Sequence, residues 1–268
     1  MARQRLGQHF LHDAGWREQI ARAIRVSRHA PERHEERPYC WIEIGAGHGE
    51  MTEHLVATGA PVYAVELDPA LVAKLQRLAT RNPNLTVMPG DVLETDLAAV
   101  AAGRRIKLYG NLPYYITSPI LHRFFERADL IDEIHIVIQL EVALRLVAQP
   151  RTRDYGYISV LTQYFSRPTI ALELPPGAFQ PPPEVDSALV SLKLPGENAK
   201  LQLANGDKFL AFVKTCFAQK RKTLMNNLRG SANPQRIQQT LVDLHLGVTA
   251  RAEELSVSEL AELYGRLS

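Results

Sequence analysis

Short apolar runs alternate with segments of helical periodicity between residues 40 and 195. The runs that predict strands are 40–44, 62–66, 85–88, 106–110 and 134–138, and helices are predicted over 51–58, 69–80, 120–127, 141–148 and 155–165. Strands that are apolar on both faces and alternate with helices are typical of a parallel sheet covered by helices on both sides. The pattern therefore predicts an α/β, Rossmann-like sheet whose ligands bind beyond the carboxyl ends of the strands.

The pattern changes toward the end of the chain. Two further strands are predicted at 169–174 and 188–194, separated by a proline-dense loop over 175–183 that cannot join a strand ladder. After Pro195 and Gly196 only helical periods follow, over 207–219, 222–228, 234–241 and 257–267. We therefore expect an α/β domain over residues 1–195 and a small all-helical domain over 196–268.

Composition narrows the class of protein. A chain of 268 residues that is 46% hydrophobic can bury a large core. It has no apolar run of eighteen residues and no secretory signal, so we expect neither a membrane span nor export. Its two cysteines, Cys40 and Cys216, lie far apart in the sequence, which favours a reducing compartment and hence a cytoplasmic location.

Positive charge is concentrated in the expected helical domain. Residues 200–230 contain seven lysines and arginines against one acidic residue, Asp207, and Arg145, Arg151 and Arg153 form a second basic group. Clustered cations suit a polyanion such as RNA, since they neutralise phosphates and release counterions. A solvated helix face would carry the same charges, so charge alone does not decide between the two.

The first candidate site is a glycine-rich turn between the strand at 40–44 and the next helix. Gly45, Gly47 and Gly49 let the backbone turn sharply and approach a ligand closely. Glu66 ends the following strand, where a carboxylate can accept hydrogen bonds from both hydroxyls of a ribose. The pair predicts an adenosine-containing cofactor. A purely structural turn and an NAD site remain alternatives, although the NAD fingerprint spaces its glycines differently.

Two later strand ends extend this prediction. Asp91 and Val92 follow the third strand, where Asp91 can accept a hydrogen bond from an adenine amino group or can simply cap a turn. The segment Asn111-Leu112-Pro113-Tyr114 follows the fourth strand. The Asn111 side-chain oxygen and the Leu112 carbonyl oxygen can each accept one N–H of an exocyclic aromatic amine.

Such acceptors direct the amine lone pair toward an electrophile, and S-adenosylmethionine carries a suitable methyl sulfonium. Pro113 stiffens the loop, and Tyr114 offers a face on which an extruded base can stack. Catalysis of this kind depends mainly on positioning. The segment thus predicts transfer of a methyl group to an adenine N6.

The chain resembles the adenine N6-dimethyltransferases of ribosomal RNA, which include the KsgA proteins of the small subunit and the Erm enzymes of the large subunit. The segments that carry the resemblance are G-Q-H-F-L at 7–11, E-I-G-A-G-H-G at 43–49, V-E-L-D at 65–68, N-L-P-Y at 111–114, F-Q-P-P-P-E-V-D-S-A at 179–188 and F-A-Q-K-R-K-T-L at 217–224. The proline loop and the C-terminal segment favour the KsgA branch. The sequence departs from the family pattern at Tyr115, Leu140 and Lys220, which leaves its RNA contacts less defined.

The resemblance implies roles for further residues. His9 and Leu11 would touch the cofactor, and Phe179 would close over the target base opposite Tyr114. It also implies that the substrate is 16S ribosomal RNA in a 30S subunit precursor, with two adjacent adenines of a 3′-terminal hairpin loop dimethylated. We expect a monomer that uses S-adenosylmethionine and neither a metal nor DNA.

Four other readings remain to be compared with this one. A non-catalytic assembly factor for the small subunit would also need basic surfaces. An Erm-like enzyme would act on 23S ribosomal RNA instead. A dehydrogenase would bind nicotinamide and tolerate changes at Asn111. A DNA adenine methylase shares the chemistry, but the C-terminal helices show no evident signature for reading bases.

Overall fold

The computed structural model describes residues 9–26, 38–113, 116–201, 203 and 205–268. The chain packs into two compact units, Met1–Ala143 with Thr169–Leu194, and Leu144–Pro168 with Pro195–Ser268. The chain passes from the first unit to the second for the last time between Leu194 and Pro195, and the boundary expected from the sequence lies one residue later. The segment 144–168, which the sequence placed with the α/β domain, instead packs with the C-terminal helices.

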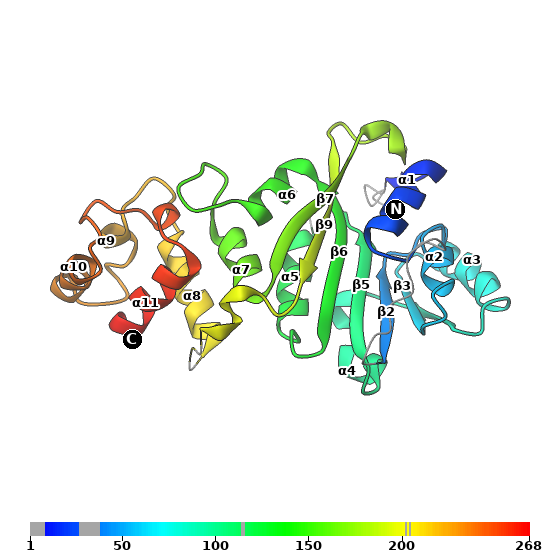
Figure 1. Cartoon of the computed structure of the whole chain (residues 1–268), viewed down its shortest axis with the longest axis horizontal. Helices are drawn as coiled ribbons and strands as arrows, with labels where there is room; N and C mark the ends of the chain where they lie inside the picture. The colour runs from blue at the N-terminus through cyan, green and yellow to red at the C-terminus, as the bar shows by residue number, and fades with distance from the viewer. Residues whose placement is uncertain (1–8, 27–37, 114–115, 202, 204) are drawn as a thin grey trace, which may run out of the picture. The chain divides into compact units, whose positions relative to one another are not determined.

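A seven-stranded sheet forms the first unit, in the order β4-β3-β2-β5-β6-β9-β7 (Figure 1). The strands are β2 (Tyr39–Ile44), β3 (Val62–Glu66), β4 (Leu85–Pro89), β5 (Arg105–Asn111), β6 (Ile131–Gln139), β7 (Arg167–Leu174) and β9 (Ser187–Lys193). The pairs from β4 through β6 are parallel, and β9 joins β6 antiparallel. The predicted α/β architecture is confirmed, with an antiparallel strand added to the parallel part.

Three helices pack on one face of this sheet. They are α1 (Ala14–Ala23), α2 (Thr52–Val56) and α3 (Pro69–Ala79). Ile20, Leu55 and Leu75, one from each helix, are fully buried in the same core cluster as Trp41 and Tyr109 of the sheet. On the other side of the sheet lies α5 (Thr117–Phe125) (Figure 1). Helices thus cover both faces and leave the strand ends for the site.

The sequence pattern missed two helices, α1 and α4 (Leu97–Ala101). The large apolar residues of α1 are only Trp16 and Ile20, set among charged neighbours, and α4 is five residues long. Aspartates begin these helices and α3: Asp13 accepts a hydrogen bond from the Trp16 amide, and Asp68 accepts one from the Ala70 amide. Asp13, Asp68 and Asp96 thus act as the N-caps of α1, α3 and α4.

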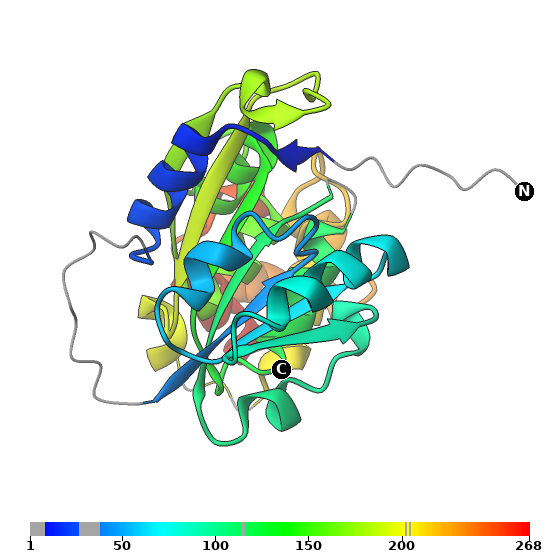
Figure 2. The ribbon, with the colours of Figure 1, turned by 90° about the vertical axis from the view of Figure 1, so that its right-hand side faces the viewer.

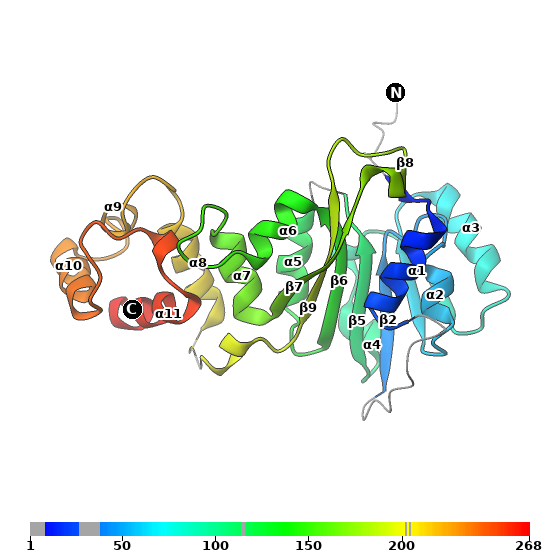
Figure 3. The ribbon, with the colours of Figure 1, turned by 45° about the horizontal axis from the view of Figure 1, so that its top comes forward.

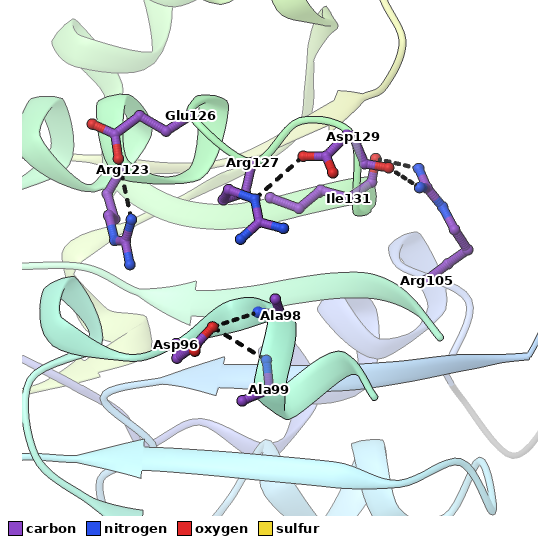
Figure 4. A network of polar contacts seen from close by, with 9 residues as sticks. All are labelled: Asp96, Ala98, Ala99, Arg105, Arg123, Glu126, Arg127, Asp129 and Ile131. Carbon is purple, nitrogen blue, oxygen red and sulfur yellow. Dashed lines mark hydrogen bonds and ion pairs between the residues drawn. The ribbon is translucent and has the colours of Figure 1, made fainter. Parts of the chain in front are cut away.

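Arg105 and Arg123 hold segments next to the parallel strands by donating hydrogen bonds to backbone carbonyl oxygens (Figure 4). Arg105 of β5 donates to the carbonyl oxygens of Asp129 and Ile131, which lie before and at the start of β6. Arg123 of α5 donates to the carbonyl oxygens of Leu93 and Thr95, each at a distance of 3.1 Å. It also forms an ion pair with Glu126. The loop that follows β4 is therefore held by a helix that comes thirty residues later.

A second, two-stranded sheet joins distant parts of the first unit. Here β1 (Phe10–Leu11) pairs antiparallel with β8 (Phe179–Gln180), so the N-terminal segment runs beside the proline loop (Figures 2 and 3). The amides of His12 and Asp13 also donate to the Ala178 carbonyl oxygen. We refer to residues 9–11 with 178–181 as the clasp.

The second unit is helical. It contains α7 (Tyr157–Phe165), α8 (Gly206–Cys216), α9 (Leu224–Asn227), α10 (Pro234–Asp243) and α11 (Val257–Leu267), and α6 (Leu140–Val147) leads into it from the sheet. The rings of Tyr164, Phe209 and Tyr264 pack in series and join α7, α8 and α11. Across the described ranges, every helix is too short or too polar to cross a membrane.

Candidate active site

A pocket lies at the carboxyl ends of β2 and β5, inside the first unit. Its empty volume is about 350 Å³, including space that is open to solvent. Its lining residues are Phe10, Leu11, Glu43, Gly45, Ala46, Gly47, Glu50, Met51, Tyr109 and Asn111. Of the residues proposed from the sequence, it brings together Leu11, Gly45, Gly47 and Asn111. His9, Glu66, Asp91 and Val92 lie outside this lining.

The glycine turn has the backbone that its sequence predicts. Gly45 and Gly47 have φ values of +62° and +59°, which side chains other than glycine rarely adopt. A Cβ on Gly47 would stand 3.3 Å from the Phe10 ring, whereas a Cβ on Gly45 would meet no atom within 4 Å. The turn is therefore closed by the clasp at Gly47 and open at Gly45.

Glu66 stabilises this turn from the end of β3. Its Oε2 accepts a hydrogen bond from the Gly47 amide, and its Oε1 accepts from the amides of Leu67 and Asp68, each at 2.9 Å. The residue is only 3% exposed. A carboxylate accepts about four hydrogen bonds, so three amides leave room for one more. The carboxylate can then take one ribose hydroxyl, not both, unless the turn rearranges.

Asp91 and Val92 open the short helix η1 (Val92–Glu94) after β4. Asp91 is exposed, and its Oδ1 accepts a hydrogen bond from the Leu93 amide at 2.9 Å, so it does cap a turn. Val92 is 5% exposed and packs inward. The contacts of Arg123 with Leu93 and Thr95 fix this turn in place.

Asn111, the last residue of β5, is held from three sides. Gly110 before it faces Ile44 so closely that a Cβ would stand 2.9 Å from the Ile44 Cβ. Leu112 after it is buried and donates its amide to the Val137 carbonyl oxygen at 3.0 Å. The Asn111 Nδ2 donates to the His9 carbonyl oxygen at 2.8 Å.

This last contact determines which way the Asn111 amide points. With Nδ2 bound to the clasp, Oδ1 accepts no hydrogen bond from the described part of the chain, and Asn111 lines the pocket. His9 is itself fixed, because its Nδ1 lies 2.7 Å from the Pro181 carbonyl oxygen. The Asn111 Oδ1 is thus an acceptor that this side chain leaves available beside the pocket.

Tyr114 and Phe179 are the two aromatic residues proposed to hold the base. Tyr114 lies outside the described residues. Phe179 pairs with Leu11 in the clasp and is 5% exposed within the core cluster. A stacking role for Phe179 therefore requires the clasp or its side chain to move. Pro113 is half-buried, and its carbonyl oxygen accepts from the Ile116 amide.

Sequence reasoning gave no role to two residues in the pocket floor, Glu43 and Tyr109. They are register partners on β2 and β5, and each is 2% exposed. Burial raises the pKa of Glu43 to about 8, aided by Glu50 and Glu66, although a hydrogen bond from Thr52 opposes the shift. Burial also raises the pKa of Tyr109. Tyr109 stands two residues before Asn111, so strand alternation could have placed both on one side of β5.

The fold and the pocket define a Rossmann-like methyltransferase. Two solved structures share the whole architecture. A dimethyladenosine transferase from Plasmodium falciparum has a TM-score of 0.77 at 22% identity, over 95% of this chain and 96% of that one. The 23S rRNA methyltransferase ErmE has a TM-score of 0.69 at 24% identity, over 96% and 99%. At these identities the likeness concerns the fold.

The chain belongs to the ribosomal RNA adenine dimethylase family, whose pattern matches residues 1–268. A relative from Koribacter versatilis, named ribosomal RNA small subunit methyltransferase A, is 36% identical over 98% of this chain and 93% of its own length. One of the same name from Synechocystis is 39% identical over 97% and 94%. The family expected from the sequence is confirmed, and the relatives' names favour the small-subunit branch over the Erm branch.

Proposed function

We propose that this chain transfers methyl groups from S-adenosylmethionine to N6 of two adjacent adenines in a 3′-terminal hairpin loop of 16S ribosomal RNA, within a precursor of the 30S subunit. The substrate class rests on family membership and on relatives named for the small ribosomal subunit. One chain contains the whole pocket, so we expect a monomer to be active. A cytoplasmic location follows from this substrate.

The observation that carries the proposal is the orientation of the Asn111 amide. An exocyclic aromatic amine is a weak nucleophile because its lone pair is delocalised into the ring. An acceptor that draws an N–H out of the ring plane moves the nitrogen toward tetrahedral geometry and localises its lone pair on nitrogen. Asn111 offers such an acceptor, because its Nδ2 is already engaged by the His9 carbonyl oxygen. The Leu112 carbonyl is the second acceptor in this proposal.

The pocket also fits the methyl donor that the family implies. The Gly45 turn leaves space where a side chain would stand, and the Tyr109 hydroxyl is buried in the floor with no hydrogen-bond partner in the part of the chain that the structure describes. Glu66 would hold a ribose hydroxyl, and Asp91 would hold the adenine. Leu11 and His9 would contribute from the clasp. Bound there, S-adenosylmethionine supplies an electrophilic methyl carbon.

The second unit supports the RNA part of the proposal. Two basic groups that are far apart in the sequence meet within it, since Lys220 Nζ donates to the Arg153 carbonyl oxygen at 2.6 Å. The exposed cations of these two groups are Arg145, Arg151, Arg153, Lys214, Lys220, Arg221 and Lys222. Such a surface would position the RNA backbone without reading bases.

Charge changes test this surface. Arg221→Glu with Lys222→Glu should weaken RNA binding at least tenfold at low salt and reduce the slope of log K against log salt by about one per lost phosphate contact. Lys208→Glu, another exposed lysine of the same unit, is the matched control. Equal affinity and equal slope for all three proteins in a filter-binding titration would remove the surface from the proposal.

The decisive experiment supplies labelled S-adenosylmethionine with unmethylated small subunits, 23S ribosomal RNA and duplex DNA in separate reactions. We expect label only in the small subunit, mapped to N6 of two neighbouring adenines near the 3′ end of its RNA. Label in 23S RNA would favour the Erm-like activity instead. Binding of small subunits without any transfer would favour an assembly factor.

A further inference from the structure

Glu43 is a buried acid in the pocket floor, and no positive charge among the described residues shifts its pKa. Thr52 of α2 donates to it, from Oγ1 to the Glu43 Oε2 at 2.5 Å. The titratable groups around it are Glu50 of the turn, Glu66 of β3 and Tyr109 of β5. A carboxylate buried among like charges with one neutral donor is costly, so the carboxyl keeps its proton in the free protein.

The Tyr109 hydroxyl lies in the same floor. It is buried, has no hydrogen-bond partner within the described ranges, and belongs to a residue that lines the same pocket as Glu43. The protonated Glu43, this Tyr109 hydroxyl and Glu50 line one pocket, and Glu66 lies near Glu43, so the environment is one that a compact cation would complete. A cation there would give Glu43 the counter-charge that the protein itself does not provide.

We propose that Glu43 releases its proton when a positively charged group of the methyl donor enters the pocket, so that donor binding and deprotonation of this carboxyl are one coupled event. The O–H bond of the carboxyl breaks, its electron pair stays on the carboxylate oxygen, and the proton passes to the buffer. The inference rests on the proposed function, because it takes the methyl donor as the ligand.

The coupling has a defined dependence on pH. In the free protein the pKa of Glu43 is raised to about 8 by burial, so at pH 7 most molecules carry the proton that binding must displace. Affinity should therefore rise close to tenfold for each unit as pH increases from 6 toward about 8, and level off above that range. Proton release should be close to one per ligand at pH 6.5 and should fall toward zero at pH 9.

Isothermal titration calorimetry of the full chain with S-adenosylmethionine tests this in buffers of different ionisation enthalpy between pH 6 and 9. The ligand's amino group also titrates in this range, so the informative quantity is the difference between wild type and Glu43→Gln. The glutamine keeps the shape and can still accept the Thr52 hydroxyl. We expect the variant to lose nearly one released proton and the rise in affinity with pH.

A second variant keeps the result interpretable if Glu43→Gln folds poorly. Thr52→Val removes the hydrogen bond that favours the carboxylate, so the window of proton release should move to higher pH. S-adenosylhomocysteine, which lacks the sulfonium but keeps the ammonium, identifies the charge: release with both ligands supports the proposal through the ammonium, and release with S-adenosylmethionine alone supports it through the sulfonium.

The experiment distinguishes a failure of the proton-coupling proposal from a failure of the proposed function. Tight binding without any difference in proton release between wild type and Glu43→Gln overturns this inference and leaves the proposed function intact. No binding of either ligand at any pH contradicts the proposed function itself.

Discussion

The two sides of the pocket are built in different ways. On the glycine-turn side, Glu66 binds the amides of Gly47, Leu67 and Asp68, so all three partners lie within 19 residues of Glu66. On the Asn111 side, the decisive contact reaches His9, which is 102 residues away, and His9 in turn contacts Pro181, 172 residues away. One side is assembled locally and the other by the tertiary fold.

The glycine-turn side holds the methyl donor in this proposal, and the Asn111 side holds the target amine. The glycine turn is held by a buried carboxylate at the end of the neighbouring strand β3, and Phe10 and Leu11 of the clasp complete the pocket beside it. The amine-holding side depends on the clasp, and the clasp requires both the N-terminal segment and the proline loop. Changes on the first side should therefore affect donor affinity and stability, and changes on the second should affect turnover.

The largest expected effect is on the Asn111 side. Asn111→Ala removes the proposed acceptor and should lower kcat by about 100-fold or more, because catalysis here depends on positioning. The dissociation constant for S-adenosylmethionine should stay within about threefold of wild type. Single-turnover kinetics and calorimetry measure the two quantities. A variant with unchanged kcat would contradict the role of Asn111.

On the opposite side, Glu66→Ala leaves three backbone amides without their acceptor. Each unsatisfied buried donor costs about 1 kcal/mol or more, so the free energy of unfolding should fall by about 3 kcal/mol. Donor affinity should fall more than tenfold while kcat at saturation changes little. Glu53→Ala, at an exposed glutamate of α2, is the control, and urea denaturation with calorimetry gives both numbers. Equal stability of the two variants would show that the turn does not need Glu66.

Replacing Glu43, on the glycine-turn side, should raise the free energy of unfolding, whereas replacing Glu66 should lower it. Because its folded-state pKa is raised from 4.5 to about 8, the unfolded chain loses this proton first as pH rises. Stability is therefore lost between about pH 4.5 and 8, and Glu43→Gln should regain about 1 to 3 kcal/mol at pH 7. Denaturation at pH 5 and pH 7 measures the difference. A variant that is less stable than wild type at pH 7 would argue against a protonated Glu43.

The smallest effect should come from the clasp. The Phe10 ring packs on Gly47 and lies 4.6 Å from the His48 ring, so Phe10→Ala should loosen the strand that carries the His9 carbonyl. We expect kcat to fall about tenfold and donor affinity to fall less. Phe10→Leu, which retains an apolar contact, should recover most of the rate. If both variants lost affinity and kept kcat, the clasp would serve the donor and not Asn111.

Much of the fold was predictable because its strands are short apolar runs with clear periodicity. The predicted strands from 40–44 to 188–194 are all present, with boundaries shifted by up to three residues. The clasp was not predictable, since β1 and β8 have two residues each and pair across the length of the chain. The segment 144–168 was assigned to the wrong neighbours because helical periodicity reveals an apolar face but not what covers it.

The sequence by itself determined the local chemistry. Glycines at fixed spacing require a particular backbone, and an Asn-Leu-Pro segment after a buried strand restricts where its oxygens can point. Only the tertiary structure decided that the His9 carbonyl orients the Asn111 amide, that three amides already occupy Glu66, and that Glu43 lies beside a Tyr109 hydroxyl with no hydrogen-bond partner among the described residues. Hydrogen bonds and burial depend on distances between segments that the order of residues does not contain.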